Sequence, residues 1–249
     1  MALARVHGSE AGASFDILAR FESEDTRSHA EVMAPFAHAA LQEAGVRGEE
    51  LDAILTGTGP GPFTGLRAGI VTARALGFAW SVPVYGMMSL TALAERAYQE
   101  RVFAQGGGAG EAEGAELLVA SDARRREVYS ARYRVNAEDY SLVDGPTVSP
   151  ASEILPGEGP SYAYGYGAGL YAETLRELGW DLVEAGEGIH PHAEYLLAAA
   201  ARRGLDALSP DTSALYLRDS DAKIPAAMLA RQQKQAARAT AQTVGQREG

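Results

Sequence analysis

The chain has 249 residues, of which 46% are hydrophobic and 22% are charged, and its formal net charge is −11. This composition is ordinary for a globular protein and excludes an intrinsically disordered chain. The absence of cysteine excludes disulfides, thiolate metal sites and a cysteine nucleophile. No apolar run approaches the roughly 20 residues of a membrane helix, and the N-terminus does not read as a signal peptide. We therefore expect a cytoplasmic protein without membrane contact.

The charge is unevenly distributed along the chain. Residues 222–249 contain five basic residues and one acidic residue, so this segment carries +4 and the remainder carries −15. An acidic body argues against a protein whose whole surface binds nucleic acid. The basic segment is typical of a solvated tail, and contact with an RNA backbone is the alternative.

Hydrophobic periodicity predicts alternating strands and helices. Strand-like segments at 1–7 and 17–21 predict an opening hairpin. Helical spacing predicts a helix over 28–44, which Gly45 ends. A buried strand at 51–56 then leads into a glycine-rich turn. The elements expected beyond it are helices over 64–80 and 89–103 around a strand at 82–85, strands at 117–121 and 127–135, helices at 169–178 and 193–203, and a last helix over 224–238.

This alternation predicts an α/β protein of two lobes. The segment 104–115 is rich in glycine and almost devoid of large apolar residues, which predicts a linker. The expected organisation is an N-terminal α/β lobe at 1–103, the linker at 104–115, a second α/β lobe at 116–210, a C-terminal segment at 211–238 that packs back on the first lobe, and a disordered tail at 239–249.

The most informative segment is Gly57-Thr-Gly-Pro-Gly-Pro-Phe-Thr-Gly-Leu-Arg-Ala-Gly69, at a predicted strand-to-helix junction. Backbone N–H groups at such a junction can bind an anion. The segment lacks the Lys-Ser/Thr of a Walker loop and does not fit G-x-G-x-x-G. The sequence therefore leaves phosphate binding open.

The helix after this loop carries small residues at every fourth position, namely Gly65, Gly69, Ala73 and Gly77. Glycine inside a helix costs up to about 1 kcal/mol relative to alanine. Another backbone is therefore expected to pack closely on this stripe. It belongs either to the protein's own sheet or to a helix of a partner subunit.

Asp122-Ala-Arg-Arg-Arg-Glu-Val-Tyr129 places three arginines in a turn between two predicted strands. The turn is either simply solvated or a contact for an anion or RNA. The histidines lack familiar metal-ligand spacing, and no serine lies in a G-x-S-x-G setting. We therefore expect no catalytic, cofactor-binding or metal-binding residue.

These motifs resemble those of the TsaB (YeaZ) family, the small subunit of the bacterial tRNA threonylcarbamoyladenosine (t6A) machinery. Gly57–Gly69 matches its G-x-G-P-G-S-F-T-G-L-R-x-G signature, with Pro62 in place of the serine. Asp122–Tyr129 matches its D-A-R-x-x-E-V-Y segment, and Leu215–Arg218 matches its late Y-L-R. The resemblance covers about residues 1–230. The family's first strand, of the type I-L-A-I-D-T-S, has no match, so either the start codon is assigned too late or the product is truncated. We expect the former, because a sheet without this strand would expose unpaired backbone groups.

The resemblance implies a two-lobed actin-like, sugar-kinase/Hsp70-type (RNase H-like) fold that lacks the first N-terminal strand. It also implies a non-catalytic subunit that pairs with the larger paralogue TsaD and the ATPase TsaE. That machinery transfers threonylcarbamoyl to N6 of adenosine 37 in tRNAs reading ANN codons. Metal and nucleotide would belong to the partners, tRNA contact would be indirect or weak, and the chain alone could form a homodimer.

In that family the first two helices make the dimer contact. The residues expected at this interface are His29, Met33, Phe36, Ala40, Gly65, Arg67, Gly69, Ala73 and Gly77. The signature loop contributes Gly57, Gly59, Pro60, Gly61, Phe63 and Thr64. Arg67 is expected to pair across the interface. The alternative is a stand-alone actin-like-fold ATPase or phosphotransferase, which Pro62 and the missing strand disfavour; for a peptidase, the sequence supplies neither nucleophile nor metal.

Overall fold

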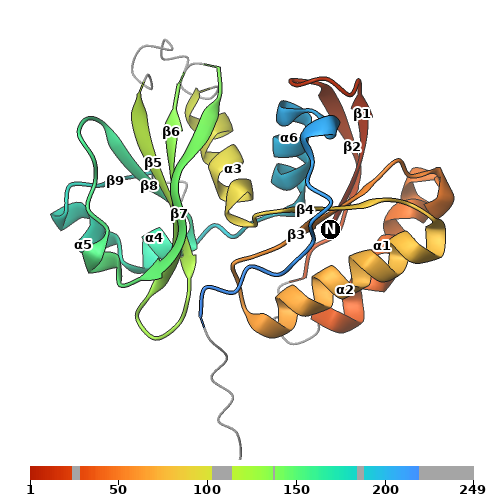
Figure 1. Cartoon of the computed structure of the whole chain (residues 1–249), viewed down its shortest axis with the longest axis horizontal. Coiled ribbons are helices and arrows are strands. Elements are labelled where there is room, and N and C mark those ends of the chain that lie inside the picture. Colours follow the sequence, from red (N-terminus) through yellow and green to blue (C-terminus); the bar gives the residue numbers. More distant parts are fainter. Residues whose placement is uncertain (24–28, 103–113, 137, 184–187, 219–249) are drawn as a thin grey trace, which may run out of the picture. The chain divides into compact units, whose positions relative to one another are not determined.

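The structure, a computed structural model, describes residues 1–23, 29–102, 114–136, 138–183 and 188–218 (Figure 1). The helices are α1 (His29–Ala44), α2 (Phe63–Trp80), α3 (Leu90–Val102), α4 (Tyr166–Leu170), α5 (Ala172–Glu177) and α6 (Ala193–Arg203), with 3-10 turns at Gly48–Glu50, Ala151–Glu153 and Leu205–Ala207. The strands are β1 (Ala2–His7), β2 (Ser14–Arg20), β3 (Ile54–Gly57), β4 (Val84–Met87), β5 (Ala115–Asp122), β6 (Val128–Val135), β7 (Tyr140–Ser149), β8 (Ser161–Tyr164) and β9 (Asp181–Leu182).

The part of the structure that contains β1 to β4, α1, α2 and α6 is called the first half here, and it holds two separate ladders. β1 pairs with β2 in an antiparallel hairpin, and β3 pairs with β4 in parallel. Helices α1 and α2 pack against these strands and against one another, while α6 packs on β1, β2 and β3 (Figure 1). The prediction that a first strand is missing from this half stays a prediction.

The second half is a five-stranded mixed sheet in the order β7-β6-β5-β8-β9. Alternate residues of β5 point to opposite faces, as the pleat of a strand requires. Leu117 and Val119 pack in a cluster with α3, whereas Leu118 and Ala120 pack in a cluster with α4 and α5. The sheet is therefore covered on both faces.

The prediction for this half was incomplete. Strands β5 and β6 are confirmed, but β7, β8 and β9 were not predicted. The predicted helix at 169–178 is instead two short helices, α4 and α5, separated at Tyr171, whose backbone leaves the helical region (φ −119°, ψ 30°).

Residues Met1–Leu217 form one compact unit, and Arg218–Gly249 form a second. The predicted division into lobes 1–103 and 116–210 therefore falls within one unit. Most of the predicted linker, and the predicted helix and tail at 224–249, lie outside the described residues. Residues 211–217 do lie on the first half, because Thr212 accepts a hydrogen bond from Arg74 (2.7 Å) and the Leu215 N–H donates to the Thr58 carbonyl (2.8 Å).

A buried carboxylate joins the two halves. Glu95 on α3 is fully buried and accepts two hydrogen bonds from the Arg202 guanidinium of α6, at 2.8 and 2.9 Å. It also accepts hydrogen bonds from the Tyr140 hydroxyl of β7 at 2.8 Å and from the Gln99 amide at 2.7 Å. The Arg202 guanidinium lies 4.4 Å from the ring centroid of Tyr98. The Glu95 carboxylate on α3 thus bonds to α6 in one half and to β7 in the other.

Helix α2 packs closely through part of its small-residue stripe. A Cβ on Gly77 would overlap the Val84 side chain and lie 2.8 Å from the Val82 carbonyl oxygen. A Cβ on Gly69 would meet only the Met33 sulfur of α1, at 3.9 Å. The close neighbour of the stripe, at Gly77, is therefore the protein's own β4 region.

Replacing Glu95 with Ala should lower the free energy of unfolding by about 3 kcal/mol or more, because it leaves the half-buried Arg202 charge without its carboxylate. Urea denaturation of the full chain measures this. Glu50→Ala, which removes the solvent-exposed pair with Arg47, is the matched control and should change stability little. Equal losses in the two variants would contradict the role of Glu95.

The chain should lose stability above about pH 10, the pKa of tyrosine in an unfolded chain. Burial, reinforced by hydrogen bonds to Glu95 and Glu100, raises the pKa of Tyr140 and Tyr164 in the folded state. Above pH 10 the unfolded chain releases protons that the folded chain retains, so stability falls with pH. Unfolding at pH 8 and pH 11 measures the slope, which Tyr140→Phe should make shallower. An unchanged slope would contradict this assignment.

Gly77→Ala should destabilise the chain by about 1–3 kcal/mol through overpacking against β4. Gly69→Ala is the matched control on the same stripe, and it should be neutral or stabilising by up to about 1 kcal/mol, because alanine favours the helix and the site has room. Thermal unfolding of both variants tests this. The opposite order would show that the stripe does not pack as described.

Candidate functional site

The signature loop is tied into the fold by its own backbone groups. The Thr58 N–H donates to the Met87 carbonyl (2.8 Å), and the Gly59 N–H donates to Ser89 Oγ (3.0 Å). Ser89 returns a hydrogen bond from its N–H to the Gly59 carbonyl (2.7 Å). Pro60 and Pro62 have no N–H to offer. The Thr58 and Gly59 amides, which an anion site at these residues would need, are therefore already hydrogen-bonded within the chain.

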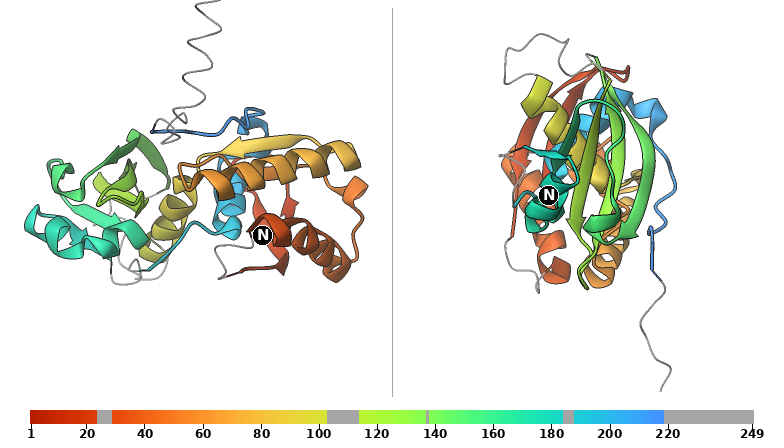
Figure 2. Two further views of the ribbon diagram at one scale, coloured as in Figure 1. Left: turned by 90° about the horizontal axis from the view of Figure 1, so that it is seen from below. Right: turned by 90° about the vertical axis from the view of Figure 1, so that its left-hand side faces the viewer.

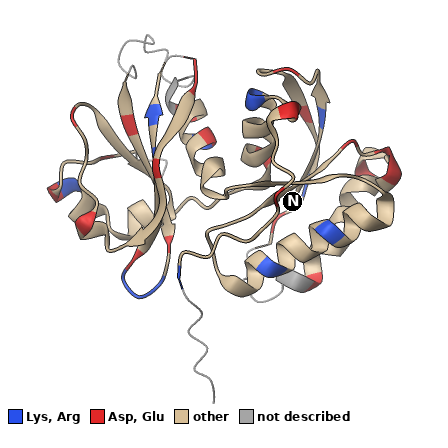
Figure 3. Cartoon of the chain, in the orientation of Figure 1, with Lys and Arg blue, Asp and Glu red and all other residues tan. Residues whose placement is uncertain are grey.

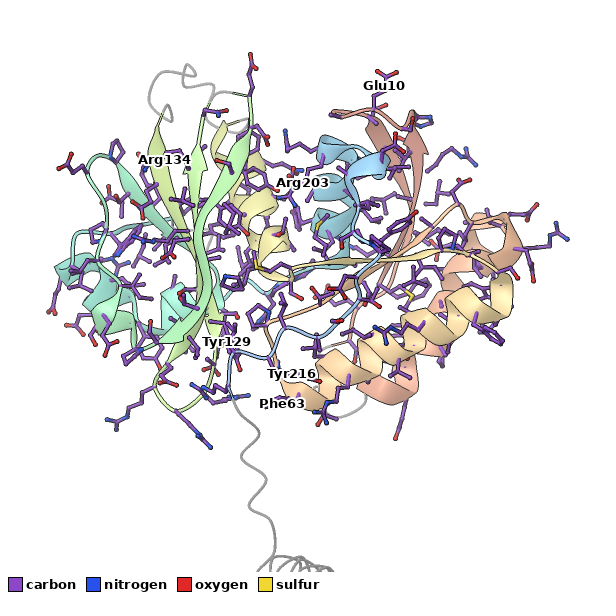
Figure 4. The ribbon with its side chains drawn as sticks, in the orientation of Figure 1. Glu10, Phe63, Tyr129, Arg134, Arg203 and Tyr216 are labelled. Carbon is purple, nitrogen blue, oxygen red and sulfur yellow. The ribbon has the colours of Figure 1, made fainter. Side chains whose placement is uncertain are left out.

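The residues that follow the loop form an aromatic cluster at the start of α2. The rings of Phe63 and Tyr216 lie 4.9 Å apart between centroids (Figure 4). The Arg67 guanidinium lies 5.5 Å from the Phe63 centroid and 5.3 Å from that of Tyr216, and Arg67 Nε donates to the Tyr216 hydroxyl at 2.7 Å. Arg67, predicted to pair across an interface, thus has a partner in its own chain.

The predicted interface residues divide between the inside and the outside of the chain. Ala40, Ala73 and Gly77 are buried in the fold. Phe36 stacks on Phe21 at 5.5 Å, and Met33 lies beside Gly69 between the two helices. The remaining positions are partly or fully exposed, namely Gly57, Gly61, Phe63, Thr64, Gly65, Arg67 and Gly69, whereas Gly59 and Pro60 are buried; the side chain of His29 lies outside the described residues.

Sequence reasoning missed the outward face of α2. Phe78 is 90% exposed and Val71 is 63% exposed, and both lie on one side of the helix with the exposed Ala75 and Ala79. The signal was present, since Val71 and Phe78 are seven residues apart and so share a helical face. The glycine stripe lies on the opposite, inward face.

The three arginines of the D-A-R segment lie at the tip of the β5–β6 hairpin, as predicted (Figure 3). Arg124, Arg125 and Arg126 have φ values of +62°, +57° and +64°, in the left-handed region. This conformation costs an ordinary L-residue about 1–2 kcal/mol. Asp122 anchors the turn, because it accepts the Arg124 N–H at 2.7 Å and pairs with its guanidinium at 3.1 Å. All three arginines are exposed.

Within the described ranges, no group of three or more His, Cys, Asp or Glu residues is arranged to hold a metal ion. His190 stacks on Tyr166 at 4.6 Å between centroids, and burial lowers the pKa of His190. None of the helices that the structure describes is long and apolar enough to cross a bilayer.

Comparison with known proteins identifies the family to which the chain belongs. Residues 16–177 match the family model described as "TsaD: tRNA N6-adenosine threonylcarbamoyltransferase". The Mycobacterium tuberculosis protein Rv3421c is 42% identical over 53% of this chain and 54% of its own length. The chain thus spans about half the length of the mycobacterial relatives it matches.

Two further relatives are named TsaB and YeaZ. The Escherichia coli tRNA threonylcarbamoyladenosine biosynthesis protein TsaB is 28% identical over 80% of this chain and 85% of its own. The structure of YeaZ from Pseudomonas aeruginosa superposes with a TM-score of 0.61 and 29% identity, covering 87% of this chain and 99% of that one. The match over residues 16–177 and these relatives together show that the chain belongs to the TsaD family, as a member of TsaB/YeaZ type.

Proposed function

We propose that the chain is a non-catalytic subunit in t6A biosynthesis that pairs with a larger TsaD paralogue through the outward face of α2. The observation that carries this is the exposure of Phe78 and Val71 on one face of a helix. Burying a phenylalanine stabilises a complex by up to about 3 kcal/mol. Contiguous exposed apolar side chains are typical of a protein interface.

The neighbouring residues suit a helix-to-helix contact. Ala75 and Ala79 are exposed beside Phe78, so a partner helix can approach α2 closely between the larger side chains. Helix α1 packs alongside the opposite, inward side of α2, so it leaves the outward face open (Figure 1). The same face could also pair two copies of this chain when the paralogue is absent.

The loop geometry favours a supporting role over a stand-alone ATPase or phosphotransferase. Its Thr58 and Gly59 amides bond to Met87 and Ser89, and two prolines interrupt the N–H groups between Gly59 and Phe63. In this proposal metal and nucleotide reside on TsaD and on the ATPase TsaE. TsaD then transfers threonylcarbamoyl to N6 of adenosine 37 in tRNAs that read ANN codons, in the cytoplasm, and TsaE joins the pair.

Replacing Phe78 with Asp should weaken binding to the TsaD paralogue of the same cell by at least about tenfold, because a carboxylate would be buried in an apolar contact. Titration calorimetry measures the affinity, and light scattering gives the stoichiometry. The thermal midpoint of the free chain should hardly move, since Phe78 is 90% exposed.

Leu155→Asp is the matched control, because Leu155 is 62% exposed and lies outside α1 and α2. It should leave the affinity unchanged. Unaltered binding by both Phe78→Asp and Val71→Asp would refute this interface, and wild-type chain that ignores the paralogue would refute the pairing itself.

A further inference from the structure

The β5–β6 hairpin presents three arginines from a backbone that disfavours them. Glycine or asparagine is the usual residue where φ is positive, since neither resists the left-handed region as arginine does. Here Arg124, Arg125 and Arg126 occupy three successive left-handed positions. Strain of this kind clusters at functional sites, where a side chain is needed in one place.

The hairpin is held rigidly at its base. The Ala123 N–H donates to the Glu127 carbonyl at 3.0 Å, and the Glu127 N–H donates to the Arg124 carbonyl at 3.0 Å. Ala123 is buried and the Asp122 side chain is only 16% exposed, so the turn is anchored while its arginines reach outward. The guanidinium groups are thus presented from a fixed frame, which lowers the entropy lost on binding an anion.

The charge of the hairpin contrasts with that of the chain around it. Residues 1–221 carry a net charge of −15, so three adjacent cations are not part of a generally basic surface. Figure 3 shows the hairpin as a blue tip at the end of β5 and β6. Asp122 pairs with Arg124 at one end of the turn, and Arg125 and Arg126 add further positive charge, which a polyanion with closely spaced phosphates would attract.

An aromatic surface lies at the same edge of the molecule. The views in Figures 1 and 2 agree in placing the β5–β6 hairpin beside the start of α2, which carries the Phe63–Arg67–Tyr216 cluster. Tyr216 is 45% exposed, and Figure 4 shows Tyr216 and Phe63 along this edge. Guanidinium groups bind phosphates, and exposed aromatic rings stack on unpaired bases.

We infer that the hairpin arginines and the Phe63–Arg67–Tyr216 cluster together form a direct RNA contact on this subunit, with arginines on the backbone and Tyr216 on an unpaired base. The inference deepens the proposed function, on which it rests for the choice of tRNA as the RNA. An acidic protein could also bind the arginines, but it would make no use of the adjacent Tyr216 ring. RNA uses both.

The test uses the full chain, alone and with its TsaD paralogue, and a fluorescent unmodified tRNA transcript that reads an ANN codon. Anisotropy at 50–200 mM salt gives the affinity and its salt slope. The variant Arg125→Gly with Arg126→Gly removes two charges and fits the left-handed backbone, so it should fold at least as well as the wild type. We expect at least about tenfold weaker binding and a slope shallower by about 1.5.

Two further variants separate the parts of the site. Arg5→Gln with Arg47→Gln removes the same charge from exposed arginines elsewhere and should leave binding near the wild-type value. Tyr216→Leu should weaken binding by about fivefold or more without changing the salt slope, because stacking releases no counterions. Equal losses in the two double variants would overturn the site.

The outcomes also separate this inference from the proposed function. If the hairpin variant pairs with the paralogue and binds tRNA like the wild type, the RNA contact is refuted and the pairing stands. If the wild-type chain binds tRNA through the hairpin but ignores the paralogue, the pairing fails and the RNA contact stands. Duplex DNA or a polyacidic peptide that competes as well as tRNA would overturn the RNA assignment.

Discussion

The structure depends on how one buried negative charge is satisfied. Glu95 lies on α3, the helix between the two halves, where no water reaches its carboxylate. An unpaired charge there would be prohibitively unfavourable, so Arg202 and Tyr140 must arrive in the correct geometry. Arg202 comes from α6 in the first half, and Tyr140 begins an edge strand of the second. The requirement therefore restricts how the two halves can be placed against α3.

Helix α2 serves two purposes on opposite sides. Its inner side uses Gly77 to approach β4 and Gly69 to admit the Met33 side chain. Its outer side keeps Val71 and Phe78 exposed. Because the inner side packs closely against β4 and α1, the outer side is held in a defined position. A rigid apolar face binds a partner with little loss of conformational entropy.

The sequence predicted the helices and strands with strong periodicity, and it predicted the α/β class. It did not predict β7, because that edge strand carries Gly145 and Pro146 and several exposed side chains, which break the apolar alternation. β8 and β9 are only four and two residues long. Segments this short are defined by their pairing with neighbours, which local patterning does not report.

For the candidate site, the sequence indicated α1, α2 and the signature loop, but not the orientation of their side chains. The stripe from Gly65 to Gly77 predicted a close backbone approach, and the approach is made by the chain's own β4 at Gly77. Arg67 was assigned to an interface because it lies at helical spacing near the stripe. Its partner in the chain, Tyr216, is 149 residues away, which local spacing does not report. The three arginines were visible as a motif, whereas their left-handed backbone required coordinates.

The hydrogen bond from Leu215 to Thr58 has a consequence for how the chain is made. The signature loop is translated early, but one of its carbonyls receives this partner only about 150 residues later, on the order of ten seconds or more at ordinary synthesis rates. Helix α6, which covers β1 to β3, is also late. The first half is thus completed only when nearly all of the described chain has left the ribosome. The cluster of Phe63, Arg67 and Tyr216 at the start of α2 is likewise completed late, because Tyr216 lies 149 residues beyond Arg67.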